Sequence, residues 1–117
     1  MKLNDAFPGK YLRQDDFEPA MAVTIDRVVE ETMPDGKEKE PVMYFRDPSR
    51  PVDVERGIVL NKTNWTIIMS IAGKDDSDEW PGTRIEVYRD PTISYGGKIT
   101  GGIRVRAIAD PGAEAFE

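Results

Sequence analysis

Cysteine and histidine are both absent from this chain of 117 residues. Without cysteine there is no disulfide framework, no thiol nucleophile and no cysteine-based zinc site. Without histidine the chain lacks the commonest general base and the commonest metal ligand. Ser-His-Asp and Cys-His mechanisms are therefore excluded, and the sequence has no phosphate-binding loop of the Gly-Lys-Ser/Thr type. We expect a protein that is not an enzyme and that uses neither a cofactor nor a metal ion.

Long apolar segments are also lacking. No stretch approaches the roughly 18 apolar residues that cross a bilayer. The charged first 16 residues have no apolar centre, so they do not resemble a secretory signal. We therefore expect no membrane association and a cytoplasmic location. A chain of this length predicts a single domain.

Acidic side chains outnumber basic ones by 22 to 16, so the net charge is −6. A negative whole-molecule field does not attract a polyanion such as DNA. The excess is uneven, however, because residues 84–106 contain five Arg and Lys against two acidic side chains, a local balance of +3. Any site for a polyanion is therefore expected within residues 84–106.

Short apolar runs separated by Gly and Pro predict a turn-rich β domain. Alternation of apolar and polar residues, and brief apolar runs, indicate five strands. We predict about ten strand residues from Met21 onward, followed by strands over 41–46, 57–60, 83–89 and 103–106.

One helix is predicted between the third and fourth strands. Asn61 or Thr63 can cap its start, and Gly73 stands where a left-handed C-terminal cap is favoured. Apolar side chains recur on one face of this helix, at Trp65, Ile68, Met69 and Ala72. Trp65 and Trp80 are both expected in the core.

Five strands with a helix between the third and fourth is the order of the OB-fold, a partly open Greek-key barrel. The alternative is another small β-barrel, such as an SH3-like barrel with an inserted helix. We divide the chain into an N-terminal arm (1–20), an OB-like barrel (21–109) and an acidic tail (110–117). The patch 9–12 with Phe17 is interpreted as a docking segment over a sheet edge or barrel end.

Several strings of residues resemble a family of small, largely uncharacterised phage and prophage proteins, over roughly residues 9–106. The resemblance implies no activity, but it implies a bacteriophage or prophage context and a bacterial host cell. The strings that carry it are Lys10-Tyr11-Leu12, Pro41-Val42-Met43-Tyr44-Phe45, Gly57-Ile58-Val59-Leu60-Asn61-Lys62-Thr63-Asn64, Gly73 through Trp80, Gly96-Gly97-Lys98, and Gly102-Ile103-Arg104-Val105-Arg106.

Basic and aromatic residues of the last two strands form the strongest candidate site. If the apolar residues face inward, period-2 alternation places their polar neighbours together on the outer face. Rings that stack on bases and arginines that meet phosphates are typical of single-stranded nucleic-acid binding. The candidate residues are Arg84, Tyr88, Arg89, Tyr95, Lys98, Arg104, Arg106 and Tyr44. The competing interpretation is an ordinary solvated face whose arginines pair with neighbouring carboxylates.

Two other motifs have simpler explanations. Asn61-Lys62-Thr63-Asn64 could attract phosphate at a helix start, but Asn and Thr are also the preferred N-caps. The carboxylates of Asp75–Glu79 lack the spacing of a calcium loop and are expected to form a solvated acidic turn.

The leading functional hypothesis is an OB-like domain that binds single-stranded DNA as a replication or recombination accessory. The alternative is an interaction or assembly module that pairs with itself or with another phage or host protein. A third hypothesis is an inhibitor whose acidic surface imitates DNA.

Overall fold

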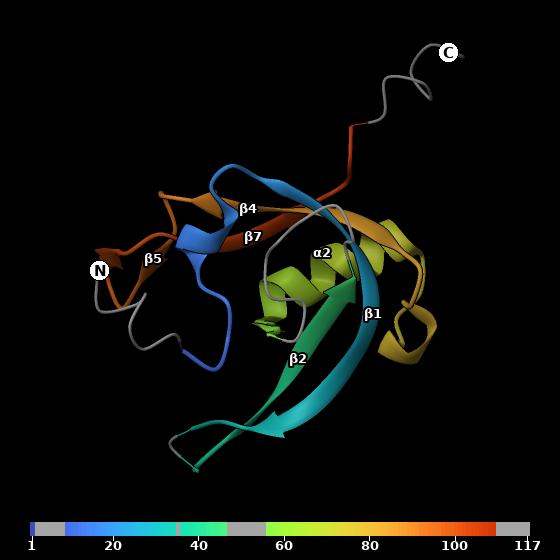
Figure 1. Cartoon of the computed structure of the whole chain (residues 1–117), viewed down its shortest axis with the longest axis horizontal. Coiled ribbons are helices and arrows are strands. Elements are labelled where there is room, and N and C mark those ends of the chain that lie inside the picture. The colour runs from blue at the N-terminus through green and yellow to red at the C-terminus, as the bar shows by residue number, and fades with distance from the viewer. Residues whose placement is uncertain (2–8, 35, 47–55, 110–117) are drawn as a thin grey trace.

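The computed structural model describes residues 1, 9–34, 36–46 and 56–109, and among them five strands form one antiparallel sheet. The order across the sheet is β3-β2-β1-β4-β7. A short hairpin, β5-β6, lies between β4 and β7 in the chain (Figure 1). The strands are β1 (Met21–Thr32), β2 (Lys39–Arg46), β3 (Ile58–Val59), β4 (Arg84–Asp90), β5 (Ser94–Tyr95), β6 (Lys98–Ile99) and β7 (Gly102–Arg106). The predicted mostly-β fold is therefore confirmed.

β1 and β2 form a long curved hairpin that reaches away from the helix (Figure 1). The first half of β1 alternates as predicted, with Met21, Val23 and Ile25 buried. The register shifts between Ile25 and Arg27, which is typical of a β-bulge, so beyond it Arg27 and every second residue lie on the outer face. The bulge thus decides which side chains of β1 are available to a ligand.

Helix α2 (Lys62–Ala72) is the predicted helix, and its caps are those predicted. The side chain of Asn61 accepts a 2.8 Å hydrogen bond from the Asn64 N–H, and Gly73 adopts φ 71°. Ile68 is fully buried against the sheet. The Trp65 and Trp80 rings are 4.6 Å apart, and Trp80 is also fully buried, as expected.

The N-terminal segment, which the sequence assigns to an arm outside the barrel, contributes to the core. Leu12 and Phe17 are 5% and 1% exposed, and the Phe17 ring packs edge-on against Phe45 with centroids 6.4 Å apart. The Leu12 N–H also donates to Gly57 O at 2.9 Å. The segment 9–17, including the 3-10 turn η1 (Gln14–Phe17), docks at a sheet edge as interpreted from the sequence.

The sheet is not closed into a barrel, which corrects this part of the OB-like prediction. β3 and β7 are the two edges of the sheet, and they do not pair within the described residues. β3 pairs over only two residues. The Asn64 side-chain amide donates to the Ile103 carbonyl at 3.0 Å, and the Leu12 N–H donates to Gly57 O just before β3. These contacts occupy positions through which the two edges would otherwise bond.

Two other predictions meet different outcomes. The residues between β4 and β7, for which the sequence predicts no strand, form the β5-β6 hairpin, which Gly96 and Gly97 close with positive φ. The segment 47–55 and the predicted acidic tail over 110–117 lie outside the described residues. In the described part of the chain, no helix is long and apolar enough to cross a membrane.

Candidate nucleic-acid interface

The outer face of β4 and β7 brings together four of the eight predicted basic and aromatic residues. Ile85, Val87 and Val105 are buried on the inner face. The register pairs Glu86 with Arg106 and Tyr88 with Arg104, so these side chains lie on the outer face. We call this group, Arg84, Glu86, Tyr88, Arg104 and Arg106, the arginine strip.

Arg106 is held by two neighbours within the strip. Its guanidinium carbon lies 4.2 Å from the centre of the Tyr88 ring. Its Nε donates to the Glu86 carboxylate at 3.0 Å, and this bond raises the pKa of Arg106 above its ordinary value. Arg106 therefore forms the cross-strand pair of the competing interpretation, and one face of Tyr88 is covered.

Arg104 and Arg84 are less constrained. The Arg104 Nη1 lies 3.4 Å from Asn64 Oδ1, a long hydrogen bond. Its charge also contributes to the lowered pKa of Asp90, which is caused mainly by a hydrogen bond from Thr92. The exposed Arg84 guanidinium makes no hydrogen bond or ion pair with any described residue.

Arg89 does not belong to the strip, although the sequence grouped it there. Because Arg89 directly follows Tyr88 in β4, its side chain lies on the opposite face. There its Nη1 donates to Glu18 at 2.9 Å and its Nε donates to Gln14 at 3.0 Å. The bond to Glu18 raises the pKa of Arg89 above its ordinary value. Arg89 thus fastens the N-terminal segment to the end of β4.

The β5-β6 hairpin extends from the end of the strip and displays two large exposed side chains. Tyr95 is 83% exposed and Ile99 is 76% exposed. Tyr95 pairs with Lys98 across the hairpin, so the ring and the ammonium group share one face. The base of the hairpin is fixed, because the Thr100 and Gly101 N–H groups both donate to Ile93 O at 2.9 Å.

Tyr44 lies outside the strip as well, in a second polar cluster that includes residues the sequence did not suggest. β1 separates its strand β2 from β4. The hydroxyl groups of Tyr44 and Tyr11 both donate to Glu31, and Arg27 lies 4.3 Å from the Tyr44 ring centre. Period-2 alternation of β1 beyond the bulge places Arg27 and Glu31 on the same outer face. No pattern in the sequence indicates that Tyr11 joins them.

This second cluster predicts a pH dependence of stability. The hydrogen bond to Glu31, together with partial burial, raises the pKa of Tyr44 from 10.0 to about 12. Folding therefore favours the neutral phenol, and its stabilisation is complete below pH 10 and is lost as the pH rises through about 12. We expect Tyr44→Phe to lower the free energy of unfolding by about 1–2 kcal/mol at neutral pH. The difference from wild type should shrink as the pH rises above about 10 in urea denaturation.

Tyr88→Phe is the matched control, since no hydrogen bond from the Tyr88 hydroxyl is found among the described residues. A Tyr44→Phe effect that stays constant from neutral pH to about pH 11.5 would contradict the assigned cause.

The acidic turn contains η2 (Ser77–Glu79) and is stabilised within itself. Asp76 accepts a 2.9 Å hydrogen bond from the Asp78 N–H, so it acts as a cap, and the neighbouring carboxylates are exposed. In the described ranges, no three Asp or Glu side chains gather as metal ligands.

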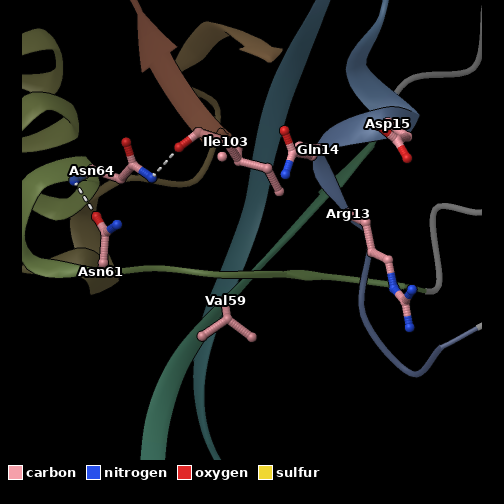
Figure 2. Close-up of a pocket in the computed structure, with 8 residues that line it drawn as sticks. Arg13, Gln14, Asp15, Val59, Asn61, Asn64 and Ile103 are labelled. Carbon is pink, nitrogen blue, oxygen red and sulfur yellow. Dashed lines mark hydrogen bonds between the residues drawn. The ribbon is translucent and has the colours of Figure 1, made fainter. Parts of the chain in front are cut away.

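A cleft of about 440 Å³ lies between the two sheet edges (Figure 2). The start of α2, β3, β7 and the N-terminal segment each form one side of it. Figure 2 shows that the side chains of Asn61, Asn64 and Gln14 come toward this space from different elements. The lining residues are Arg13, Gln14, Asp15, Val59, Asn61, Asn64, Gly102 and Ile103.

Comparisons of the chain with models of protein families, with curated proteins and with solved structures found no match. The resemblance to phage and prophage proteins therefore stays a prediction, and functional inference depends on the geometry of the sites.

Proposed function

We propose that this chain is a non-enzymatic, OB-like domain that binds single-stranded DNA along the arginine strip and the β5-β6 hairpin. The observation that carries the proposal is the 83% exposed Tyr95 ring, which lies opposite Lys98 on a hairpin anchored at the end of the strip. An exposed ring gives a base a stacking surface, and the neighbouring ammonium group meets a phosphate.

The topology supports the proposal. The order β3-β2-β1-β4-β7, with a helix after β3, supports an OB-like arrangement in which the two edge strands do not pair within the described residues. In this arrangement the β5-β6 hairpin occupies the loop between the fourth and fifth OB strands, one of the loops that OB-folds use to bind oligonucleotides. The stacking residue and the ligand loop therefore coincide.

The charge distribution limits the affinity. With a net charge of −6, attraction of DNA depends on the strip and hairpin alone. We expect micromolar or weaker binding that falls steeply as salt increases. A weak, non-enzymatic binder of this kind suits an accessory role in replication or recombination in a phage or prophage context.

Tyr95→Ala tests the stacking role. We expect the variant to bind a fluorescent oligonucleotide of about eight nucleotides roughly five- to tenfold more weakly at low salt, because one base–aromatic stack is lost. Tyr95→Phe keeps the ring and should keep the affinity. Fluorescence anisotropy measures both.

Lys98→Glu should weaken binding further, and Lys74→Glu is its matched control, since both change the net charge equally and Lys74 is exposed at the far end of α2. The proposal fails if wild type gives no anisotropy change at low salt, or if Lys74→Glu weakens binding as much as Lys98→Glu does.

Ile99 favours a second function, that of a protein-interaction module. It is 76% exposed on a hairpin, and a large exposed apolar side chain suits a protein contact better than a phosphate chain. Self-association that is concentration-dependent in light scattering and is lost in Ile99→Ser would favour this function. Self-association should not be tested by deletion of residues 1–18, because this deletion removes the core side chains Leu12 and Phe17.

A further inference from the structure

The walls of the cleft between β3 and β7 contain main-chain groups that a closed barrel would pair. The Leu60 N–H donates to Pro41 O, so antiparallel alternation turns the N–H and C=O of Val59 away from β2 and toward the cleft. On the opposite wall the Ile103 carbonyl accepts from Asn64, which lies on the side of β7 away from β4. The Ile103 N–H points to this same side, and neither it nor the Val59 N–H has a main-chain partner among the described residues.

A side-chain donor adds to these groups. The Asn61 Oδ1 is used by the helix cap, so its Nδ2 group points away from the cap, toward the cleft, as Figure 2 shows. This amide group has no hydrogen-bond partner in the described part of the chain. The cleft therefore offers at least three N–H donor groups and one C=O acceptor within a small space.

The shape of the cleft selects the kind of occupant. An extended peptide strand needs a groove that is open at both ends, because each residue advances the strand by about 3.3 Å. Here β3 offers an edge of only two paired residues, and residues 13–15 and the start of α2 line the same cleft as β3 and β7 (Figure 2). Its volume of about 440 Å³ lies within the usual range for a small ligand. A flat group with donors and acceptors along its edge fits these walls.

The cleft adjoins the arginine strip. Arg104 belongs to the strip, and its guanidinium lies 3.4 Å from Oδ1 of Asn64, whose amide nitrogen bonds the wall of the cleft. We propose that the cleft receives one nucleobase of a single strand bound along the strip, and this inference rests on the proposed function. The base edge would bond the Val59 and Ile103 main-chain groups and Asn61 Nδ2, as recognition of unstacked bases requires.

The test compares three oligonucleotides of about eight nucleotides: oligothymidylate, oligoadenylate and a chain of abasic sites with the same phosphates. In amide NMR spectra of the full chain, we expect the better-bound base-containing strand to shift the Val59 and Ile103 amides and the Asn61 side-chain amide. The abasic chain should shift Arg84 and Arg104 but leave these three signals in place.

Asn61→Ser supplies the matching variant, because serine keeps the helix cap and removes the amide donor. We expect it to weaken binding of the base-containing strand about three- to tenfold and to leave binding of the abasic chain unchanged. Thr63→Ala, on the same exposed turn, should change neither affinity.

The outcomes separate this inference from the proposed function. If the oligonucleotides bind and shift the strip while the three cleft signals stay in place, the nucleobase inference is overturned and the proposed function stands. If no oligonucleotide binds, both fail. If a six-residue Thr-Val peptide moves the cleft signals and no oligonucleotide does, the cleft binds a peptide strand and the inference is again overturned.

Discussion

Phe17→Ala is expected to lower the free energy of unfolding by about 3–5 kcal/mol, a typical cost of removing a buried phenylalanine. Phe17 is 1% exposed and packs against Phe45, so the substitution leaves a cavity between the N-terminal segment and β2. Since small domains have a total stability of about 5–15 kcal/mol, the variant should be partly unfolded well below the wild-type melting temperature. Urea denaturation followed by tryptophan fluorescence measures the difference.

Tyr95→Ala is the matched control, because it removes an aromatic ring that is 83% exposed and should change the free energy of unfolding by less than about 0.5 kcal/mol. A loss below about 1 kcal/mol for Phe17→Ala would mean that the N-terminal segment is not an integral part of the core.

The contrast between α2 and the N-terminal segment shows which structure this sequence predicts. The strands and α2 could be recognised because apolar residues repeat with periods of 2 and 3.6, and because Asn61 and Gly73 mark the ends of the helix. Leu12 lies outside any regular element and Phe17 ends a short 3-10 turn, so no repeating pattern of apolar residues predicts their burial. Their place in the core depends on contacts with residues far away in the chain, such as Phe45.

The closure of the sheet depends on even weaker signals. The order of five strands and one helix predicts an OB-like barrel, but closure requires β3 and β7 to bond. β3 pairs over only two residues, and Asn64, which reads as a residue of the helix cap, uses its side chain to bond the Ile103 carbonyl. Both facts depend on three-dimensional placement, so the sequence alone overestimates how far the sheet closes.

The candidate site was predictable in its position but not in its contacts. Period-2 alternation correctly places Arg84, Tyr88, Arg104 and Arg106 on the outer face of β4 and β7. It also shows that Arg89 faces the other way, yet the bonds from Arg89 to Glu18 and Gln14 join segments about 70 residues apart and leave no local pattern. Tyr44 is a candidate from the sequence, but the strand order places it outside the strip, because β1 lies between β2 and β4.

The largest effect on DNA binding is expected for the double variant Arg104→Glu/Arg106→Glu. Each reversal removes a phosphate contact and adds a repulsive charge, so a cost of about 1 kcal/mol per position weakens binding about thirtyfold at low salt. The dependence of log affinity on log salt should fall by about 1.4, because two contacts with a single strand are lost. Anisotropy titrations at several salt concentrations measure both quantities.

Lys39→Glu/Lys74→Glu provides the control with the same net charge, since both lysines are exposed and lie outside the strip. Arg104→Gln/Arg106→Gln separates loss of contact from repulsion and should give a smaller effect of the same sign. Unaffected binding in the Glu variant, with an unchanged circular dichroism spectrum, would remove the strip from the proposed interface.

Glu86→Gln distinguishes an arginine that binds DNA from one that only joins two strands. In the wild-type chain Arg106 donates to Glu86 at 3.0 Å, so the carboxylate competes with any phosphate for the same guanidinium. If Arg106 contacts DNA, removal of the charge at residue 86 should tighten binding by about three- to fivefold, because competition and like-charge repulsion both disappear. If Arg106 serves only the sheet, the same variant should lose stability and tighten binding less, because only the repulsion disappears. The opposite signs expected for Glu86→Gln and Arg106→Glu make the pair a direct test of the strip.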